Sequence, residues 1–157
     1  MTGGCGGVAV SLAEGAAVSG DVGAGSEEAL ELAILQALAA NDDVKATLGD
    51  PPRVFDIAEA APAYPYLEIL RHETRPAGSA GVEASEHRID LSIASRAGNR
   101  KEARAALAAV RSALSGASLS MEGWRCIQMQ TLVAELASDP SGAPRIVLRI
   151  RCGLEVA

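Results

Sequence analysis

Apolar residues recur with two different periods along the chain, and these periods divide it into helices and strands. Leu30, Ile34 and Leu38 follow one another at intervals of four, which is typical of the buried face of an α-helix. Ser26 precedes this stripe and is followed by two glutamates, so we expect Ser26 to cap the helix start. A further short helical turn is predicted over residues 44–48, ahead of a pair of prolines.

A second amphipathic pattern predicts a longer helix over residues 99–114. Its apolar stripe consists of Ala103, Leu107, Val110 and Leu114. Asn99 with Glu102 three residues later resembles a capping box, and Gly116 suits the position after the helix end. This segment carries the clearest helical signal in the chain.

The remaining apolar positions predict strands. Ile89, Leu91 and Ile93 are separated by polar residues, and this period of two indicates a strand with one solvated face. Flanking prolines confine the first short strand to a sheet edge, because proline cannot donate a ladder hydrogen bond. In the last strand, apolar side chains occupy one face and arginines the other. The predicted strands span residues 53–57, 66–74, 88–94, 124–136 and 145–156.

These elements follow one another in the order α-β-β-β-α-β-β, with connections of hairpin length. We therefore predict an α+β domain in which a largely antiparallel sheet has two helices packed on one face. Residues 26–157 form this single domain, and residues 1–25, rich in glycine and alanine, are expected to form a flexible N-terminal arm. A chain of 157 residues is long enough to bury its own core without disulfides.

The charge of the chain narrows the choice of partners. A formal net charge of −6 disfavours direct nucleic-acid binding, which needs a basic stripe that neutralises phosphates. A negative net charge also suits a protein conduit along which DNA slides without binding to the wall. Residues 1–25 lack the basic start of a secretory signal, and no run approaches the ~18–20 apolar residues that cross a bilayer. We expect no membrane partner.

Sites for catalysis are scarce in this sequence. Aromatic residues make up only 3% of the chain, so the apolar pockets that usually hold small molecules should be few. The G-x-S-x-G nucleophile motif is missing, and the carboxylates form no pattern that pairs an acid with a base. We predict that the protein is not an enzyme and has no catalytic, metal or cofactor site.

Two histidines and two cysteines are the remaining candidates for chemistry. His72 and His87 flank the predicted hairpin loop at residues 76–84, so pairing of their strands would bring the imidazoles together. With a neighbouring glutamate they could bind a metal, but we favour solvated or interface histidines. Cys126 and Cys152 fall in predicted strands, where cysteine usually behaves as a small buried hydrophobe.

Two loops and a row of arginines are the candidates for contacts with other proteins. Mobile loops on a rigid sheet often carry recognition. The arginines of the last strand could serve a neighbouring subunit's carboxylates, and a solvated outer sheet face is the alternative account. The predicted contacts to another subunit or to a tube are Arg75, Gly78, Ser79, Gly81, Asp139, Ser141, Arg145, Arg149 and Arg151.

The succession of elements resembles the tail terminator and tail completion proteins of long-tailed phages, prophages and gene transfer agents. The resembling segments are residues 28–38, 43–49 (DVKATLG), 64–69 (YPYLEI), 87–93 (HRIDLSI), 99–114 and 145–151 (RIVLRIR), in the family's order. The resemblance implies a hexameric ring that caps the head-proximal end of the tail tube, stops tube polymerisation and joins the tail to the head connector.

The same resemblance implies the partners of the protein. They are further copies of itself in a homohexamer, the tail tube protein and the head-tail connector or stopper protein, with DNA only as passing cargo in the lumen. The implied location is the host cytoplasm during assembly and then the head-tail junction of the particle. Two alternatives stay open: a head completion or neck protein of the same particle, and a small-molecule-binding or catalytic α+β dimer.

Overall fold

The fold is known from a computed structural model that describes residues 22–157 except 61, 79–80, 97, 139 and 141. Its helices are α1 (Val22–Ala39), α2 (Asp42–Leu48) and α3 (Arg100–Ser115). Its strands are β1 (Val54–Phe55), β2 (Tyr66–Pro76), β3 (Ala84–Ala94), β4 (Trp124–Ser138) and β5 (Pro144–Val156). The α+β class is confirmed, and the element order agrees with the prediction once the short α2 is counted as a helix.

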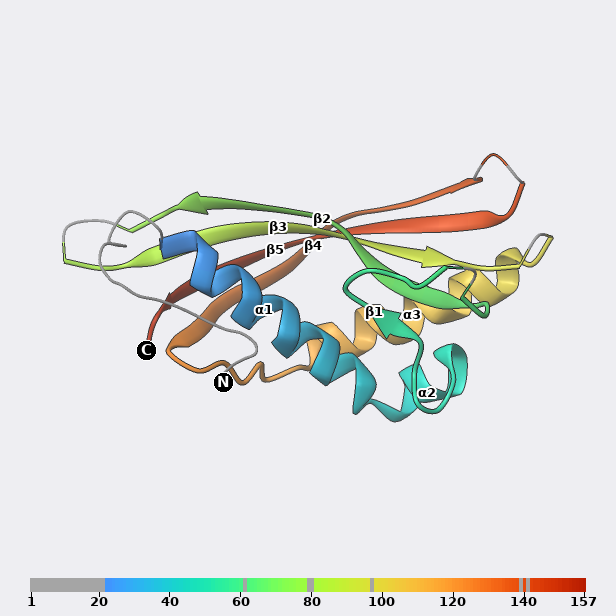
Figure 1. The fold of residues 1–157 in the computed structure, drawn as a ribbon, viewed down its shortest axis with the longest axis horizontal. Coiled ribbons are helices and arrows are strands. Elements are labelled where there is room, and N and C mark those ends of the chain that lie inside the picture. Colours follow the sequence, from blue (N-terminus) through green and yellow to red (C-terminus); the bar gives the residue numbers. More distant parts are fainter. Residues whose placement is uncertain (1–21, 61, 79–80, 97, 139, 141) are drawn as a thin grey trace.

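The five strands form one sheet in the order β1-β2-β3-β5-β4. The pairs β2–β3, β3–β5 and β4–β5 are antiparallel, whereas β1 pairs with β2 in parallel, so the sheet is mixed rather than purely antiparallel. The short β1 lies at a sheet edge, as its flanking prolines predict. The four other strands make a long, gently twisted sheet (Figure 1).

All helices lie on one face of the sheet, and the other face is left uncovered (Figure 1). The prediction placed two helices on that face, and the structure adds a third, because α2 packs against α3. The alternation in β5 decides which residues meet the helices. Ile146, Leu148, Ile150, Cys152 and Leu154 are buried on the helix side, together with Leu91 and Ile93 of β3.

Helix α1 begins earlier than the apolar stripe predicts. It starts at Val22, so Ser26 lies inside the helix and the prediction that Ser26 caps its start is wrong. The Ser26 side chain is buried, and its Oγ lies 3.2 Å from Nε2 of His87. Residues 22–25 of the predicted arm therefore belong to α1, and residues 1–21 lie outside the described residues.

Helix α3 starts as its sequence predicts. The Asn99 side chain accepts a hydrogen bond from the Glu102 backbone N–H at 3.0 Å. The Glu102 carboxylate does not complete a capping box, since it accepts hydrogen bonds from the Ser95 hydroxyl at 2.7 Å and from the Arg96 guanidinium at 2.7 Å. These bonds tie the helix start to the end of β3.

Removal of this cap should measurably weaken the fold. We expect Asn99→Ala to lower the free energy of unfolding by about 1 kcal/mol, because one N–H of the first turn loses its acceptor. Asn99→Asp keeps an acceptor at the same place and serves as the matched control. Urea unfolding at one fixed protein concentration measures both variants, and equal midpoints for Asn99→Ala and the wild type would contradict the capping role.

Candidate interface surfaces

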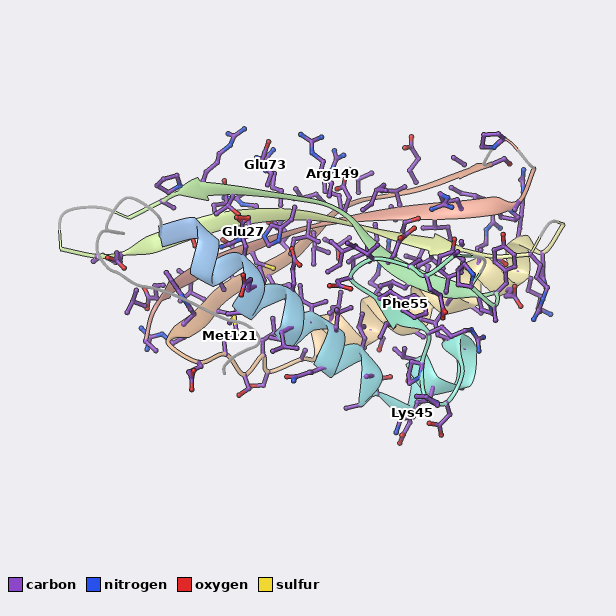
Figure 2. The ribbon with its side chains drawn as sticks, in the orientation of Figure 1. Glu27, Lys45, Phe55, Glu73, Met121 and Arg149 are labelled. Carbon is purple, nitrogen blue, oxygen red and sulfur yellow. The ribbon has the colours of Figure 1, made fainter. Side chains whose placement is uncertain are left out.

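The uncovered face of the sheet carries a network of charged side chains. Cross-strand register places Arg71 of β2 and Arg149 of β5 on either side of Asp90 in β3. One step along the strands, Arg88 of β3 stands between Glu73 and Arg151. Glu73 and Arg149 point away from the helices (Figure 2). This face therefore presents alternating positive and negative groups to whatever packs on it.

The three arginines predicted as an interface row are already engaged within the chain. Arg149 donates two hydrogen bonds to the Asp90 carboxylate, at 2.8 and 3.2 Å, and this contact raises the pKa of Arg149 above its ordinary value. Arg151 forms an ion pair with Glu86 at 2.5 Å. Arg145 donates to the Ser92 hydroxyl at 2.5 Å. The row lies on the outer face, but its guanidinium groups are only partly available to a partner.

A different arginine on the uncovered face, which the sequence analysis missed, is uncommitted. Arg88 is exposed, and within the described residues its guanidinium has no ion-pair or hydrogen-bond partner. It lines a shallow hollow of about 200 Å³ with Arg71, Glu73, Arg75, Asp90 and Arg149. Four guanidinium groups thus surround two carboxylates, which makes this spot locally positive on an acidic chain.

Arg75 is also a predicted contact residue, and it lines this hollow together with Arg149 of the predicted arginine row. It shares Glu73 with Arg71, at N···O distances of 3.5 and 3.6 Å, and both arginines are largely exposed. Exposed pairs at such distances contribute little free energy. Their guanidinium groups can therefore turn to a stronger acceptor at low cost.

The predicted loops lie at opposite ends of the sheet. The β2–β3 loop stands beside the C-terminal end of β5, because Ala84 pairs with Glu155, whereas the β4–β5 turn stands beside Ala94 and Arg145 (Figure 1). They do not form one site with each other.

The loop residues themselves divide into two groups. Gly81 has a φ of +81° and takes a backbone conformation that L side chains rarely adopt. Gly78 lies so close to the Val82 carbonyl that a β-carbon would clash with it. Both glycines are therefore required by the turn, whatever the loop contacts. Ser79, Asp139 and Ser141 lie outside the described residues.

Strand β4 is a second surface that sequence reasoning missed. It forms the edge of the sheet opposite β1 and pairs with β5 on one side only. Ile127, Leu132 and Val133 are 56%, 37% and 50% exposed there, although each is a large apolar side chain. The signal in the sequence is the apolar run Leu132, Val133 and Ala134, which departs from the period of two of a strand with one solvated face.

The two histidines meet in the interior rather than at the surface. His72 Nε2 lies 2.7 Å from His87 Nδ1, and His72 Nδ1 lies 2.6 Å from the Glu31 carboxylate of α1. On its other side, His87 Nε2 lies 2.8 Å from the Ser85 hydroxyl. The predicted approach of the imidazoles is confirmed, but their solvated or interface character is wrong, because β2 and β3 run on past both residues beneath α1.

Burial sets the protonation of this cluster. His87 is fully buried, and loss of hydration, followed by repulsion from His72, lowers the pKa of His87 to about 4. No set of three histidine, cysteine, aspartate or glutamate side chains suited to a metal occurs among the described residues. With His87 uncharged near pH 7, the cluster forms a hydrogen-bonded clamp that holds α1 on the β2–β3 hairpin.

The cysteines fit their predicted role only in part. Cys152 is buried, as predicted, whereas Cys126 is half-buried and lines a hollow beside the C-terminal end of α3. A hydrogen bond from the Cys152 thiol lowers the pKa of Cys126 to about 6. Both are free thiols.

Comparison with known proteins identifies the family to which this fold and chain belong. The model of one family, described as "Tail completion protein gp17", matches residues 32–155. The chain belongs to this tail completion family. The resemblance drawn from the order of helices and strands is therefore confirmed for the tail completion protein, from the middle of α1 to the end of β5.

A solved structure supports the same conclusion. This tail completion protein is similar to a chain of the "Virion of native gene transfer agent (GTA) particle", with a TM-score of 0.74 and 27% sequence identity. The similarity covers 82% of this chain and 96% of that chain. No curated protein sequence matches the chain. Among the described residues, no helix is long and apolar enough to span a membrane.

Proposed function

We propose that this tail completion protein closes into a homohexameric ring, caps the head-proximal end of a tail tube and stops its polymerisation. The observation that carries the proposal is the match to the tail completion family over residues 32–155. The similar chain from a gene transfer agent virion, covered over 96% of its length, supports a place in such a particle. A family of structural virion proteins also argues against an enzyme.

The placement of the loops supports a role between two partners. A terminator must meet the tail tube on one side and the head connector or stopper protein on the other. The β2–β3 loop and the β4–β5 turn stand at opposite ends of the sheet, so the two ends can serve these two contacts (Figure 1). In this arrangement DNA passes through the lumen as cargo, and the ring assembles in the host cytoplasm before it joins the head-tail junction.

Electron microscopy of tubes grown from purified tail tube protein tests the capping role. Addition of this protein during growth should shorten the tubes and leave a six-fold ring at one end. Tubes of unchanged length without a terminal ring would reject the capping function. A ring found only within the connector of the parent particle would favour a head completion or neck protein, and a ligand-bound dimer would favour the small-molecule alternative.

Charge reversal at Arg88 tests whether the hollow takes part in assembly. We expect Arg88→Glu to weaken association with other copies or with the tube by about tenfold, which corresponds to about 1.4 kcal/mol. Because Arg88 has no ion-pair partner within the described chain, its reversal breaks no ion pair of the subunit, and the new carboxylate stands between Glu73 and Arg151. Arg149→Glu is a poorer test, since it would set a second carboxylate against Asp90.

Arg104→Glu provides the matched control for this experiment. Arg104 is exposed on α3, and α3 covers the opposite face of the sheet. Native mass spectrometry and tube sedimentation measure association, and circular dichroism measures the fold. Equal losses for Arg88→Glu and Arg104→Glu, or no loss for either, would remove the hollow from the interface.

A further inference from the structure

The structure points to the seam of the ring, and this inference rests on the function proposed above. We propose that the free edge of β4 pairs antiparallel with residues 69–76 of β2 in the next copy, so that one sheet runs continuously around the ring. The occupant of the β4 edge is thus a second copy of this chain. Both edges are exposed, and their strands run in directions that allow antiparallel pairing.

Strand β4 lacks most of the usual protections of an edge strand, although bulges at Ile127 and Leu132 interrupt its pairing with β5. Natural edges are commonly short or carry lysine, proline or inward-pointing charges, because unpaired N–H and C=O groups otherwise recruit another chain. β4 has 15 residues with the sequence WRCIQMQTLVAELAS, without lysine or proline. None of these residues is buried, and the structure describes the strand throughout. Such a long and apolar edge is suited to a partner strand.

The opposite edge of the same sheet is also largely open. β1 pairs only with Leu67 and Glu68, which leaves residues 69–76 of β2 without a neighbouring strand on that side among the described residues. Leu70, at the bulge of β2, is 53% exposed. Two different open edges, each with exposed apolar side chains, can meet in the heterologous contact that a ring requires.

Strand direction makes these two edges compatible. The order β2-β3-β5-β4 alternates in direction at each step, because all three pairs are antiparallel. The number of strands is even, so β4 runs opposite to β2. Rotation of a copy about an axis roughly along the strands therefore sets β4 antiparallel to the next β2, and the hydrogen-bond pattern continues across the seam. A contact between two β4 strands would instead be two-fold and would stop at a dimer.

The seam would use both main chain and side chains. Backbone hydrogen bonds along an added strand supply affinity, and the side chains beside them supply specificity. Ile127, Leu132 and Val133 from β4 would be covered by the next copy, together with its Leu70. This accounts for large apolar side chains that the isolated subunit leaves in solvent.

Engineered disulfides distinguish the seam from its alternatives. Val133→Cys is combined in the same chain with Leu70→Cys, and Glu135→Cys with Leu70→Cys, so that two antiparallel registers two residues apart are sampled. Oxidation of at least one double variant should produce a ladder of covalent species up to six chains on a non-reducing gel. Each single variant, and the wild type with its native cysteines, should yield no ladder under the same conditions.

Other outcomes of the crosslinking overturn the seam. Efficient dimers from Val133→Cys alone would show a two-fold contact between β4 strands. No ladder from any pair, while native mass spectrometry shows a six-subunit species, would place the interface elsewhere and leave the proposed function standing. A wild type that forms no six-subunit species, even with tail tube protein present, would overturn both the ring and this seam.

A charged edge provides an independent test without cysteines. We expect Leu132→Lys with Val133→Lys to reduce the six-subunit species at least tenfold, because lysines on an edge strand oppose strand addition. Leu32→Lys is the matched control, since Leu32 of α1 is 58% exposed and lies on the helix side of the sheet. Unchanged assembly of the double lysine variant, with an intact fold by circular dichroism, would contradict the seam.

Discussion

Acidification from pH 7 to pH 4 should lower the free energy of unfolding through His87, by at most about 3 kcal/mol. The pKa of His87 is about 4 in the folded protein and 6.5 in a model peptide, and one pKa unit corresponds to about 1.4 kcal/mol. Between these two values the unfolded chain binds a proton that the folded chain excludes. Stability from this group is therefore complete above about pH 6.5 and is lost as the pH falls towards 4.

The loss has a specific structural origin. A second proton on His87 would give the imidazole a positive charge that is buried beneath α1 and lies against His72, 2.7 Å away. Glu31 contacts the far side of His72 and offsets only part of this cost. Ser26, Ser85 and Thr74 complete the surroundings with hydroxyl groups, which carry no compensating charge.

Urea unfolding as a function of pH measures this effect, with His87→Gln as the comparison. The variant should be less stable at pH 7 because the clamp loses hydrogen bonds, but its stability should change less between pH 6.5 and pH 4. The difference between wild type and variant should therefore shrink in acid. Parallel curves for the two proteins would show that His87 does not titrate as proposed. Glu28→Gln, an exposed substitution on α1, should follow the wild type.

Leu148→Ala should cost about 3 kcal/mol of unfolding free energy, since large-to-small substitutions of this kind leave a cavity and cost roughly 2–5 kcal/mol. Leu148 is fully buried on the helix side of β5. It stands at the centre of the sheet, paired with Leu91 of β3 and Ala134 of β4. Both neighbouring strands hold their places, so little relaxation can fill the space that the leucine leaves.

The fall in melting temperature should be roughly 6–12 °C for a domain of this size. Leu32→Ala is the matched control, because Leu32 is 58% exposed on α1, and its cost should stay within about 0.5 kcal/mol. Both variants are compared at one protein concentration, since ring formation would add a concentration-dependent term. A cost below about 1 kcal/mol for Leu148→Ala would mean that the sheet and helices are loosely packed at this point.

Local patterns predicted the helices and strands because the buried residues of each element recur with the period of that helix or strand. The alternation of Ile89, Leu91 and Ile93 with polar residues is the burial pattern of β3, and Asn99 caps α3 as its position predicts. The start of α1 was misplaced for a physical reason. Ser26 is a favoured cap in isolation, but here the β2–β3 hairpin offers its hydroxyl a buried partner, and α1 extends past it to Val22.

The candidate interface was harder to predict, because charge balance on a sheet depends on which strands are neighbours. The sequence shows that Arg145, Arg149 and Arg151 share a strand face, yet it does not show that Asp90 and Glu86 stand opposite two of them. These contacts engage part of the row and leave Arg88 as an uncommitted guanidinium on the uncovered face. The strand order, which the sequence does not show either, also places β4 at an edge of the sheet.

The sequence by itself determined the α+β class, the order of the elements, the residues that enter the core and the resemblance to tail completion proteins. These properties depend on periodicity and on local capping, and both are written in residues only a few positions apart. Only the tertiary structure decided the strand order β1-β2-β3-β5-β4, the clamp between His72, His87 and Glu31, and the open edges of β2 and β4. Each of these arises from contacts between residues distant in sequence, whose partners no local pattern specifies.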